Sequence, residues 1–255
     1  MILALFAFFI SGATFGIIGA GGSIFTVPIM VYLMKTNPVS AVSYSFYLVG
    51  FTAFCGFISY SKQGLTKFKN AMPLAIPSVF GIIIAKYLLL PAIPEVIFGV
   101  QKSKVLMCIF AILMIVNAAA MVLFRRNNAL KTGKKYTIYA LFLGILIGII
   151  IGILGIGGGF LIIPALYHLL KLDIKYAIGT SLFIIFANCA LAIAIDIFHD
   201  ISISYSILLP MLLASIAGML TGVKYGKNIN NNKVKFMFAG FTLVIGIAVL
   251  ITEFF

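Results

Sequence analysis

Long apolar segments constrain this chain more than any other feature. Polar residues divide it into eight apolar blocks, at 2–34, 38–61, 68–90, 103–124, 137–170, 173–198, 202–224 and 233–254. A run of about 20 apolar residues can cross the hydrocarbon core of a bilayer as an α-helix. Only 9% of the residues are charged, whereas a soluble domain usually carries about 25%. The sequence therefore predicts an all-α integral membrane protein that crosses the bilayer several times.

Composition and motifs exclude several other classes of function. The net charge is +13, and the basic residues lie in short connecting segments, as in cytoplasmic loops, rather than on a nucleic-acid-binding surface. Cys55, Cys108 and Cys189 lie within apolar segments at no metal-binding spacing, so we interpret them as small core residues. The sequence has no paired nucleophile and base, no His-Glu-x-x-His and no Cys-x-x-Cys. We expect no enzyme, no metal or other cofactor and no nucleic-acid partner, and the oligomeric state stays open.

The chain repeats itself at an offset of 136 residues. The offset aligns Pro28 with Pro164, Ser45 with Ser181, and a cluster of glycines with a second cluster. One extra residue then aligns Pro73 with Pro210 and Gly81 with Gly218. We therefore predict a first transmembrane repeat at 1–124, a basic cytoplasmic linker at 125–135 and a second transmembrane repeat at 136–255. Each repeat would be a Gly-broken helical hairpin followed by three transmembrane helices, an organisation typical of secondary transporters.

The glycine clusters predict a break within each long first block. A block of about 33 residues would be about 50 Å long as one helix, against a hydrocarbon core of about 30 Å. The second short helix of each block would begin near Ser23 or Gly159, where free N–H groups favour an anion. Tight helix packing is the alternative, and we prefer it for Gly12-x-x-x-Gly16 and Gly144-x-x-x-Gly148. The predicted backbone donors to a substrate are Gly21, Gly22, Ser23, Gly157, Gly158 and Gly159.

A polar helix face is the second candidate feature. Ser45, Thr52 and Ser59 are seven residues apart and share one face, and Ser181 and Asn188 hold the positions equivalent to Ser45 and Thr52. Such side chains suit either a hydrated path or hydrogen bonds between helices, and both interpretations stay open here.

Ionisable residues within the apolar blocks are few. Lys86, Lys224 and His168 lie near expected helix ends, where long side chains extend toward the membrane surface. Asp196, His199 and Asp200 cluster at the end of their block, and we interpret them as a solvated loop rather than a cation site or proton relay. No pair of carboxylates lies at mid-membrane depth.

The distribution of Lys and Arg predicts the topology. If each long block folds back at its glycine break, 14 of the 18 basic residues lie on one side of the membrane and 4 on the other. If each long block crosses once, the split is 8 and 10. Because short cytoplasmic loops carry excess Lys and Arg, the fold-back arrangement is favoured. The two repeats would then be inverted, with Met1, Lys35 and Phe255 outside and the linker inside.

The motifs carry a resemblance to a known family. Residues 16–28, Gly-Ile-Ile-Gly-Ala-Gly-Gly-Ser-Ile-Phe-Thr-Val-Pro, and the matching residues 152–164 resemble the sulfite exporter TauE/SafE family of probable membrane transporters. Ala177-Ile-Gly-Thr-Ser181 is similar to that family's next motif, whereas the first repeat departs from the pattern with Ser23 for glycine and Ser43-Tyr44 for Gly-Thr.

This resemblance implies transport of a small anion, such as sulfite or an organosulfonate, across a prokaryotic plasma membrane. We therefore predict a secondary transporter whose partners are a small anionic solute and the lipid bilayer. The alternatives are a passive channel or permease of the same architecture, and a membrane scaffold without solute flux.

Overall fold

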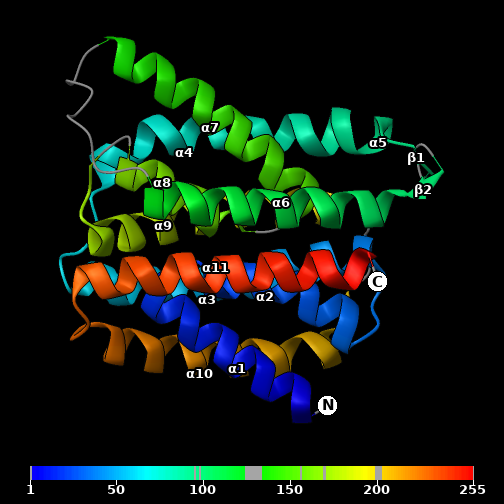
Figure 1. Ribbon diagram of the computed structural model, residues 1–255, viewed down its shortest axis with the longest axis horizontal. Helices are drawn as coiled ribbons and strands as arrows, with labels where there is room; N and C mark the ends of the chain where they lie inside the picture. Colours follow the sequence, from blue (N-terminus) through cyan, green and yellow to red (C-terminus); the bar gives the residue numbers. More distant parts are fainter. Residues whose placement is uncertain are drawn as a thin grey trace.

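The computed structural model describes residues 2–94, 96–97, 99–123, 134–155, 157–168, 171–198 and 203–254. Within them the chain is almost entirely helical (Figure 1). The elements of the first half are α1 (Ile2–Ile18), α2 (Gly21–Pro28), the π-helix η1 (Ile29–Leu33), α3 (Pro38–Lys62), α4 (Phe68–Ile84), the π-helix η2 (Ala85–Leu89), α5 (Leu90–Ala92), β1 (Val96–Ile97), β2 (Val100–Gln101) and α6 (Lys102–Leu123). Those of the second half are α7 (Lys134–Leu154), α8 (Gly159–His168), α9 (Ile174–Phe198), α10 (Tyr205–Gly226) and α11 (Asn231–Phe254).

Six helices in the described residues are long and apolar enough to cross a membrane, three in each half of the chain. The span in α3 is 61% buried and that in α9 is 50% buried, against 33–39% for the other four. Helices α3 and α9 therefore form the centre of the bundle, and the rest present apolar side chains to lipid. The predicted all-α membrane protein is confirmed.

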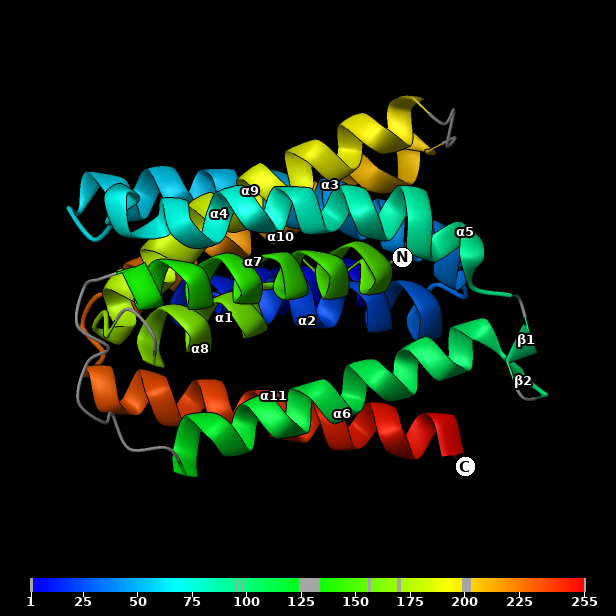
Figure 2. The ribbon, with the colours of Figure 1, turned by 90° about the horizontal axis from the view of Figure 1, so that it is seen from above.

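The helices associate in pairs drawn from opposite halves of the chain. Helix α1 packs on α10, α4 on α7, α6 on α11 and α3 on α9, and Figures 1 and 2 show α6 and α11 running side by side along one flank. Glycines make two of these contacts close. A Cβ added to Gly12 would collide with the carbonyl of Ser215, and one added to Gly148 would collide with the carbonyl of Ser78. The packing role predicted for the two Gly-x-x-x-Gly pairs is confirmed.

Both chain termini lie at the same end of the bundle (Figure 1). There the Tyr32 hydroxyl, at the end of η1, donates a hydrogen bond to the Glu253 carboxylate near the end of α11. The short β1–β2 hairpin extends from this end too, and we call it the terminal end.

The opposite end carries most of the basic loops. Lys175 Nζ donates to the carbonyl of Lys227 at 2.7 Å, and Lys67 Nζ lies 4.9 Å from the centre of the Tyr176 ring. We call this the basic end. Helix α6 ends here and α7 begins here. The predicted linker 125–135, apart from Lys134 and Lys135, lies outside the described residues.

Two π-helical turns interrupt the regular helices. Helix η1 directly follows Pro28, and η2 ends two residues before Pro91. Proline lacks an N–H donor and crowds the carbonyl four residues earlier, so Pro91 favours a distortion at Tyr87 within η2. The second of these turns carries Lys86.

Candidate functional site

Both long first blocks break at their glycine clusters. Helix α1 ends at Ile18, Gly19 has φ +79°, and α2 begins at Gly21. In the second half, Gly155 and Gly158 have φ +67° and +78° between α7 and α8. These left-handed conformations strain any residue with a Cβ, which is why glycine occupies them. The predicted breaks are therefore present, and the second short helices begin close to the predicted Ser23 and at the predicted Gly159.

The two breaks touch each other. A Cβ added to Gly159, the first residue of α8, would lie 2.9 Å from the carbonyl oxygen of Gly19 and 3.0 Å from Cα of Ala20. Ala20 is the N-cap of α2, and its side chain makes no capping hydrogen bond. The first N–H groups of a helix have no partner within it. The N-termini of α2 and α8 thus meet within the bundle.

The six predicted backbone donors belong to the two segments that make this contact. Gly157 and Gly159 pack against Ile185 of α9, with added Cβ positions 3.1 Å from its side chain. Gly22 is buried, and the side chain of Ser23 lies outside what the structure describes. The breaks are thus enclosed by the central helices rather than open at the surface.

The four predicted polar residues are all buried, and three have their hydroxyls paired. Ser45 donates to the carbonyl of Gly155 in the second break. Ser181 donates within its own helix to Ile178 at 2.8 Å. Thr52 donates to Leu48 at 2.6 Å and lies 3.1 Å from the hydroxyl of Ser215. Hydrogen bonds between helices, one of the two interpretations of this polar face, are thus present, and a hydrated path stays a prediction.

Asn188 is the polar residue with unused hydrogen-bonding capacity. It is fully buried, its Oδ1 accepts from Ser78 of α4 at 2.9 Å, and its Nδ2 has no partner among the described residues. A buried amide donor without an acceptor costs about 1–3 kcal/mol. Asn188 follows Ile185 by one helical turn and therefore lies beside the breaks. A ligand that accepts hydrogen bonds would relieve this cost.

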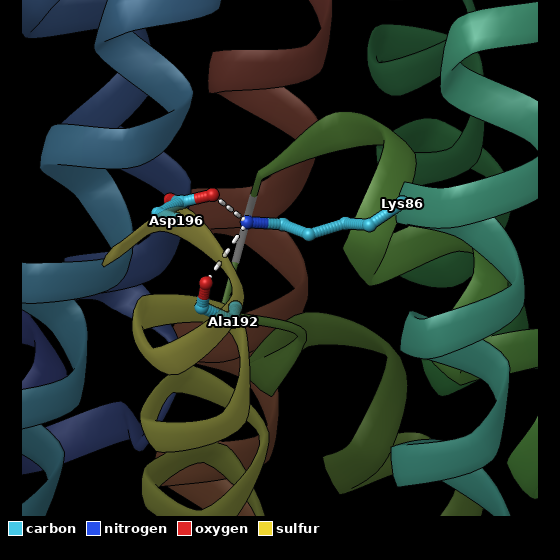
Figure 3. Close-up of polar contacts among 3 residues, drawn as sticks. All are labelled: Lys86, Ala192 and Asp196. Carbon is cyan, nitrogen blue, oxygen red and sulfur yellow. Dashed lines mark hydrogen bonds and ion pairs between the residues drawn. The ribbon is translucent and has the colours of Figure 1, made fainter. Parts of the chain in front are cut away.

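A buried ion pair joins Lys86 to Asp196 farther along the same helices (Figure 3). The side chains are only 6% and 5% exposed, and Lys86 Nζ also donates to the carbonyl of Ala192 at 3.0 Å. Both earlier interpretations were therefore wrong: Lys86 does not extend to the membrane surface, and Asp196 is not in a solvated loop. His199 and Asp200 lie outside the described residues.

Matched spacing along two helices, together with the contact of Ser78 with Asn188, accounts for this pair. Lys86 follows Ser78 by eight residues on α4 and its π-helical extension, and Asp196 follows Asn188 by eight residues on α9. Once Ser78 contacts Asn188, two helices running in the same direction bring the charges together. Hydropathy alone places each charge near a helix end and gives no hint of the partner.

A surface pocket opens at the basic end, away from the breaks. It has a volume of about 140 Å³. Its lining residues are Tyr167, Asp173, Ile174, Asn231, Asn232 and Lys235. None of them belongs to the predicted site, so the pocket is a separate feature of the basic end.

Comparisons with known proteins agree with this architecture. The family model described as "Sulfite exporter TauE/SafE" matches residues 3–249. The chain is similar to a "Probable membrane transporter protein" of Xylella fastidiosa, with 27% identity over 81% of this chain and 77% of the relative. It is also similar to the Bacillus subtilis proteins named "Probable membrane transporter protein YunE" and "YjnA", at 28% and 26% identity. These two alignments cover 87% and 94% of this chain, and 85% and 95% of the relatives.

No solved structure gives a significant match. The relatives are named as membrane transporters and not as enzymes. With six apolar spans and a family match over nearly its whole length, the chain belongs to the sulfite exporter TauE/SafE family and is a multi-pass membrane transporter of the plasma membrane.

Proposed function

We propose that this transporter is a secondary carrier for a small anion, such as sulfite, an organosulfonate or a related sulfur compound. The observation that carries the proposal is the contact between the two breaks, Gly159 against Gly19 and Ala20. Two helix N-termini that meet inside a bundle direct their positive dipole ends and free N–H groups at one place. Broken helices that meet near the midplane form the substrate sites of many secondary transporters.

The roles follow from the geometry of each group. The backbone N–H groups at Gly21, Gly22, Ser23, Gly157, Gly158 and Gly159 would bind the anion. Asn188 would add a side-chain donor through its unpaired Nδ2. Ser45, Thr52 and Ser181 would line the path, with their oxygen atoms available to a second partner.

We also infer that residues 1–124 and 136–255 are repeats of opposite orientation. Equivalent contacts support this. Thr52 pairs with Ser215, and its counterpart Asn188 pairs with Ser78, the counterpart of Ser215. Equivalent turns support it too, since Lys35 and Lys171 have φ +54° and +51° at the ends of the two fold-back segments. Figure 1 shows α1 starting at the terminal end and α7 at the basic end.

The charge distribution supports an orientation. The loops at 62–69, 171–175 and 224–235 share the basic end, where α6 also ends and α7 begins. Because excess Lys and Arg mark the cytoplasmic side, the basic end would face the cytoplasm and the terminal end the outside.

A flux assay on purified protein in proteoliposomes tests the proposal. We expect uptake of at least one of sulfite, sulfate, thiosulfate and methanesulfonate above that of protein-free vesicles. Accumulation against a gradient would identify a secondary carrier, and flux that stops at equal concentrations would identify a channel or passive permease. No flux of any of the four anions would contradict the proposal and favour a carrier of another solute or a scaffold.

A further inference from the structure

The Lys86–Asp196 pair has no counterpart elsewhere in the described residues of the bundle. At the equivalent positions of the other half stand Val223 and Tyr60, and the Tyr60 hydroxyl donates to the carbonyl of Gly16 at 2.8 Å. The contacts of Ser78 with Asn188 and of Thr52 with Ser215 match each other. The ion pair lies beside the first of these contacts and has no equivalent beside the second. It lies toward the terminal end, where α9 finishes and η2 leads to the β hairpin.

Stability alone does not explain the pair. Moving two charges into a low-dielectric interior costs several kcal/mol per ion, and replacing a buried pair with apolar residues is often neutral or stabilising. Charged residues within membrane spans usually mark the pathway of a substrate or an ion. Lys86 also lies on the π-helical turn η2, a distortion that is frequent at functional sites.

The ion pair lies along the same interface between α4 and α9 as Asn188 of the proposed central site. Helices α4 and α9 meet at Ser78 and Asn188, and eight residues farther along each helix they meet again at Lys86 and Asp196. Eight helical residues span about 12 Å. An anion that leaves Asn188 toward the terminal end would therefore reach Lys86 next.

The coordination of Asp196 is incomplete. The ammonium of Lys86 contacts Asp196 and the Ala192 carbonyl (Figure 3). It also lies 4.6 Å from the centre of the Phe46 ring. Asp196 uses one oxygen, and its buried Oδ2 has no partner among the described residues. Asp196 thus contacts the Lys86 ammonium through a single oxygen, and another anion could replace that contact.

We propose that Lys86 binds the transported anion at the outer end of the path, and that Asp196 takes its place there when no anion is bound. This inference rests on the proposed function. When the anion displaces Asp196, a buried carboxylate is left without a cation, at a cost of several kcal/mol. The carboxylate relieves that cost by taking a proton from the outer water. With a monoanion such as methanesulfonate, the site then holds one cation, one anion and a neutral acid, so its net charge stays at zero, and one proton accompanies each anion.

Few other groups near the pair can titrate in its place. Tyr47 of α3 interacts with Asp196 and with Tyr205 of α10, and Cys189 of α9 lies near Lys86. Tyrosine and cysteine ordinarily ionise above about pH 8, so neither would replace the Asp196 carboxylate as the proton acceptor in this proposal. His199 follows in the chain, outside the described residues, and is therefore included as a control.

Anion uptake under an imposed pH gradient tests this coupling. The probe is methanesulfonate, or thiosulfate if methanesulfonate is not carried, because both stay ionised near neutral pH. In wild-type proteoliposomes an acidic exterior should accelerate uptake. Asp196→Asn should bind the anion without taking up a proton, so uptake should continue and its response to the pH gradient should disappear. Lys86→Gln should raise the external KM about tenfold or more, as expected for the loss of a charged hydrogen-bond partner.

Two further variants separate coupling from folding. Lys86→Gln/Asp196→Asn keeps a neutral hydrogen-bonding pair, so it should fold even if either single variant does not, and it should lack both the affinity and the pH response. Lys224→Gln removes an exposed lysine, and His199→Gln removes the neighbouring imidazole. Both should behave as wild type.

The outcomes are distinguishable. If the wild-type protein carries none of the four anions, the proposed function fails and this inference fails with it. If the wild-type protein carries an anion but ignores the pH gradient, only the role of the pair fails. A double variant with wild-type KM and wild-type pH response would show that the pair is structural.

Discussion

Gly158 has a backbone conformation that glycine adopts far more readily than other residues, at φ +78°. A side chain there would meet Ile151 of α7 and would cost about 1–2 kcal/mol in backbone strain alone. A leucine would also cover the N–H groups at the start of α8. We therefore expect Gly158→Leu to abolish anion flux in proteoliposomes while the protein still inserts and purifies as a folded species.

Gly64 offers a matched control for this variant. It has φ +70°, and nothing lies within 4 Å of an added Cβ. Gly64→Leu therefore imposes the same kind of strain away from the breaks and should retain flux. Normal flux per folded molecule in Gly158→Leu would remove the second break from the substrate site.

Asn188 tests the second part of the site. Replacing it with leucine removes one hydrogen bond to Ser78, and interhelical hydrogen bonds in membrane proteins are worth only about 0.6 kcal/mol on average. The unpaired Nδ2 lowers stability when no ligand is bound, so its removal offsets the loss of that hydrogen bond. Asn188→Leu should therefore lower flux by about tenfold or more, if one anion contact is worth about 1.4 kcal/mol, while the melting temperature in detergent changes little.

Thr242→Val is the matched change outside the site. Thr242 is fully buried in α11, and among the described residues its hydroxyl bonds only to the carbonyl of Phe238 in its own helix. It should affect flux and melting temperature little. If Asn188→Leu instead lost stability while each folded molecule transported normally, Asn188 would be a packing residue.

The sequence predicts a feature well where only one residue type can form it. Gly19 and Gly158 could be predicted as breaks because an apolar block of that length needs an interruption and glycine permits it. Lys86 and Asp196 could not be paired, because they are 110 residues apart and each alone resembles a charge at a helix end. Only the packing of α4 on α9 brings them together.

The helices themselves were largely predictable from hydropathy. The block at 38–61 became α3 at Pro38–Lys62, and the block at 233–254 became α11 at Asn231–Phe254. The partner of each helix was not predictable. A Gly-x-x-x-Gly pair indicates a close neighbour, but nothing in α1 indicates that the neighbour is α10.

Helix packing gives a prediction about stability. Gly12→Leu and Gly148→Leu would each force a side chain into the carbonyl of a facing serine, Ser215 or Ser78, where backbone cannot yield easily. Overpacking of this kind typically costs about 1–3 kcal/mol, and occasionally more. Both variants should melt at a lower temperature in detergent and express poorly.

Gly240→Leu is the control for these two helix contacts. Gly240 lies within α11, and nothing is within 4 Å of an added Cβ. Its melting temperature should stay close to that of the wild type. If Gly12→Leu had the same melting temperature as the wild type, this would contradict the close packing of α1 on α10.

The charged residues are distributed unequally between the two ends of the bundle. Basic loops gather at one end, whereas Glu253 and Asp196 lie toward the other. The distribution of Lys and Arg along the sequence favours a fold-back of the first block. Its consequence, that Ile2 and Thr36 share an end, agrees with the position of α1 and η1 in Figure 1. Labelling from the two sides of a membrane measures which end of the bundle faces the cytoplasm.

Cysteine accessibility in intact cells provides that measurement. On a background in which Cys55, Cys108 and Cys189 are replaced, Ile2→Cys and Thr36→Cys should react with a membrane-impermeant maleimide added outside. Single cysteines at Lys62 and Asn228, both exposed at the basic end, should react only after the cells are opened. The reason is that α1 and η1 start and finish at the terminal end, while α3 crosses to the basic end and α10 ends there. Labelling of positions 2 and 36 from opposite sides would contradict the fold-back, and with it the inverted repeats. Labelling of all four positions in the reverse sense would keep the fold but turn the protein over, and Lys86 would then bind its anion from the cytoplasm.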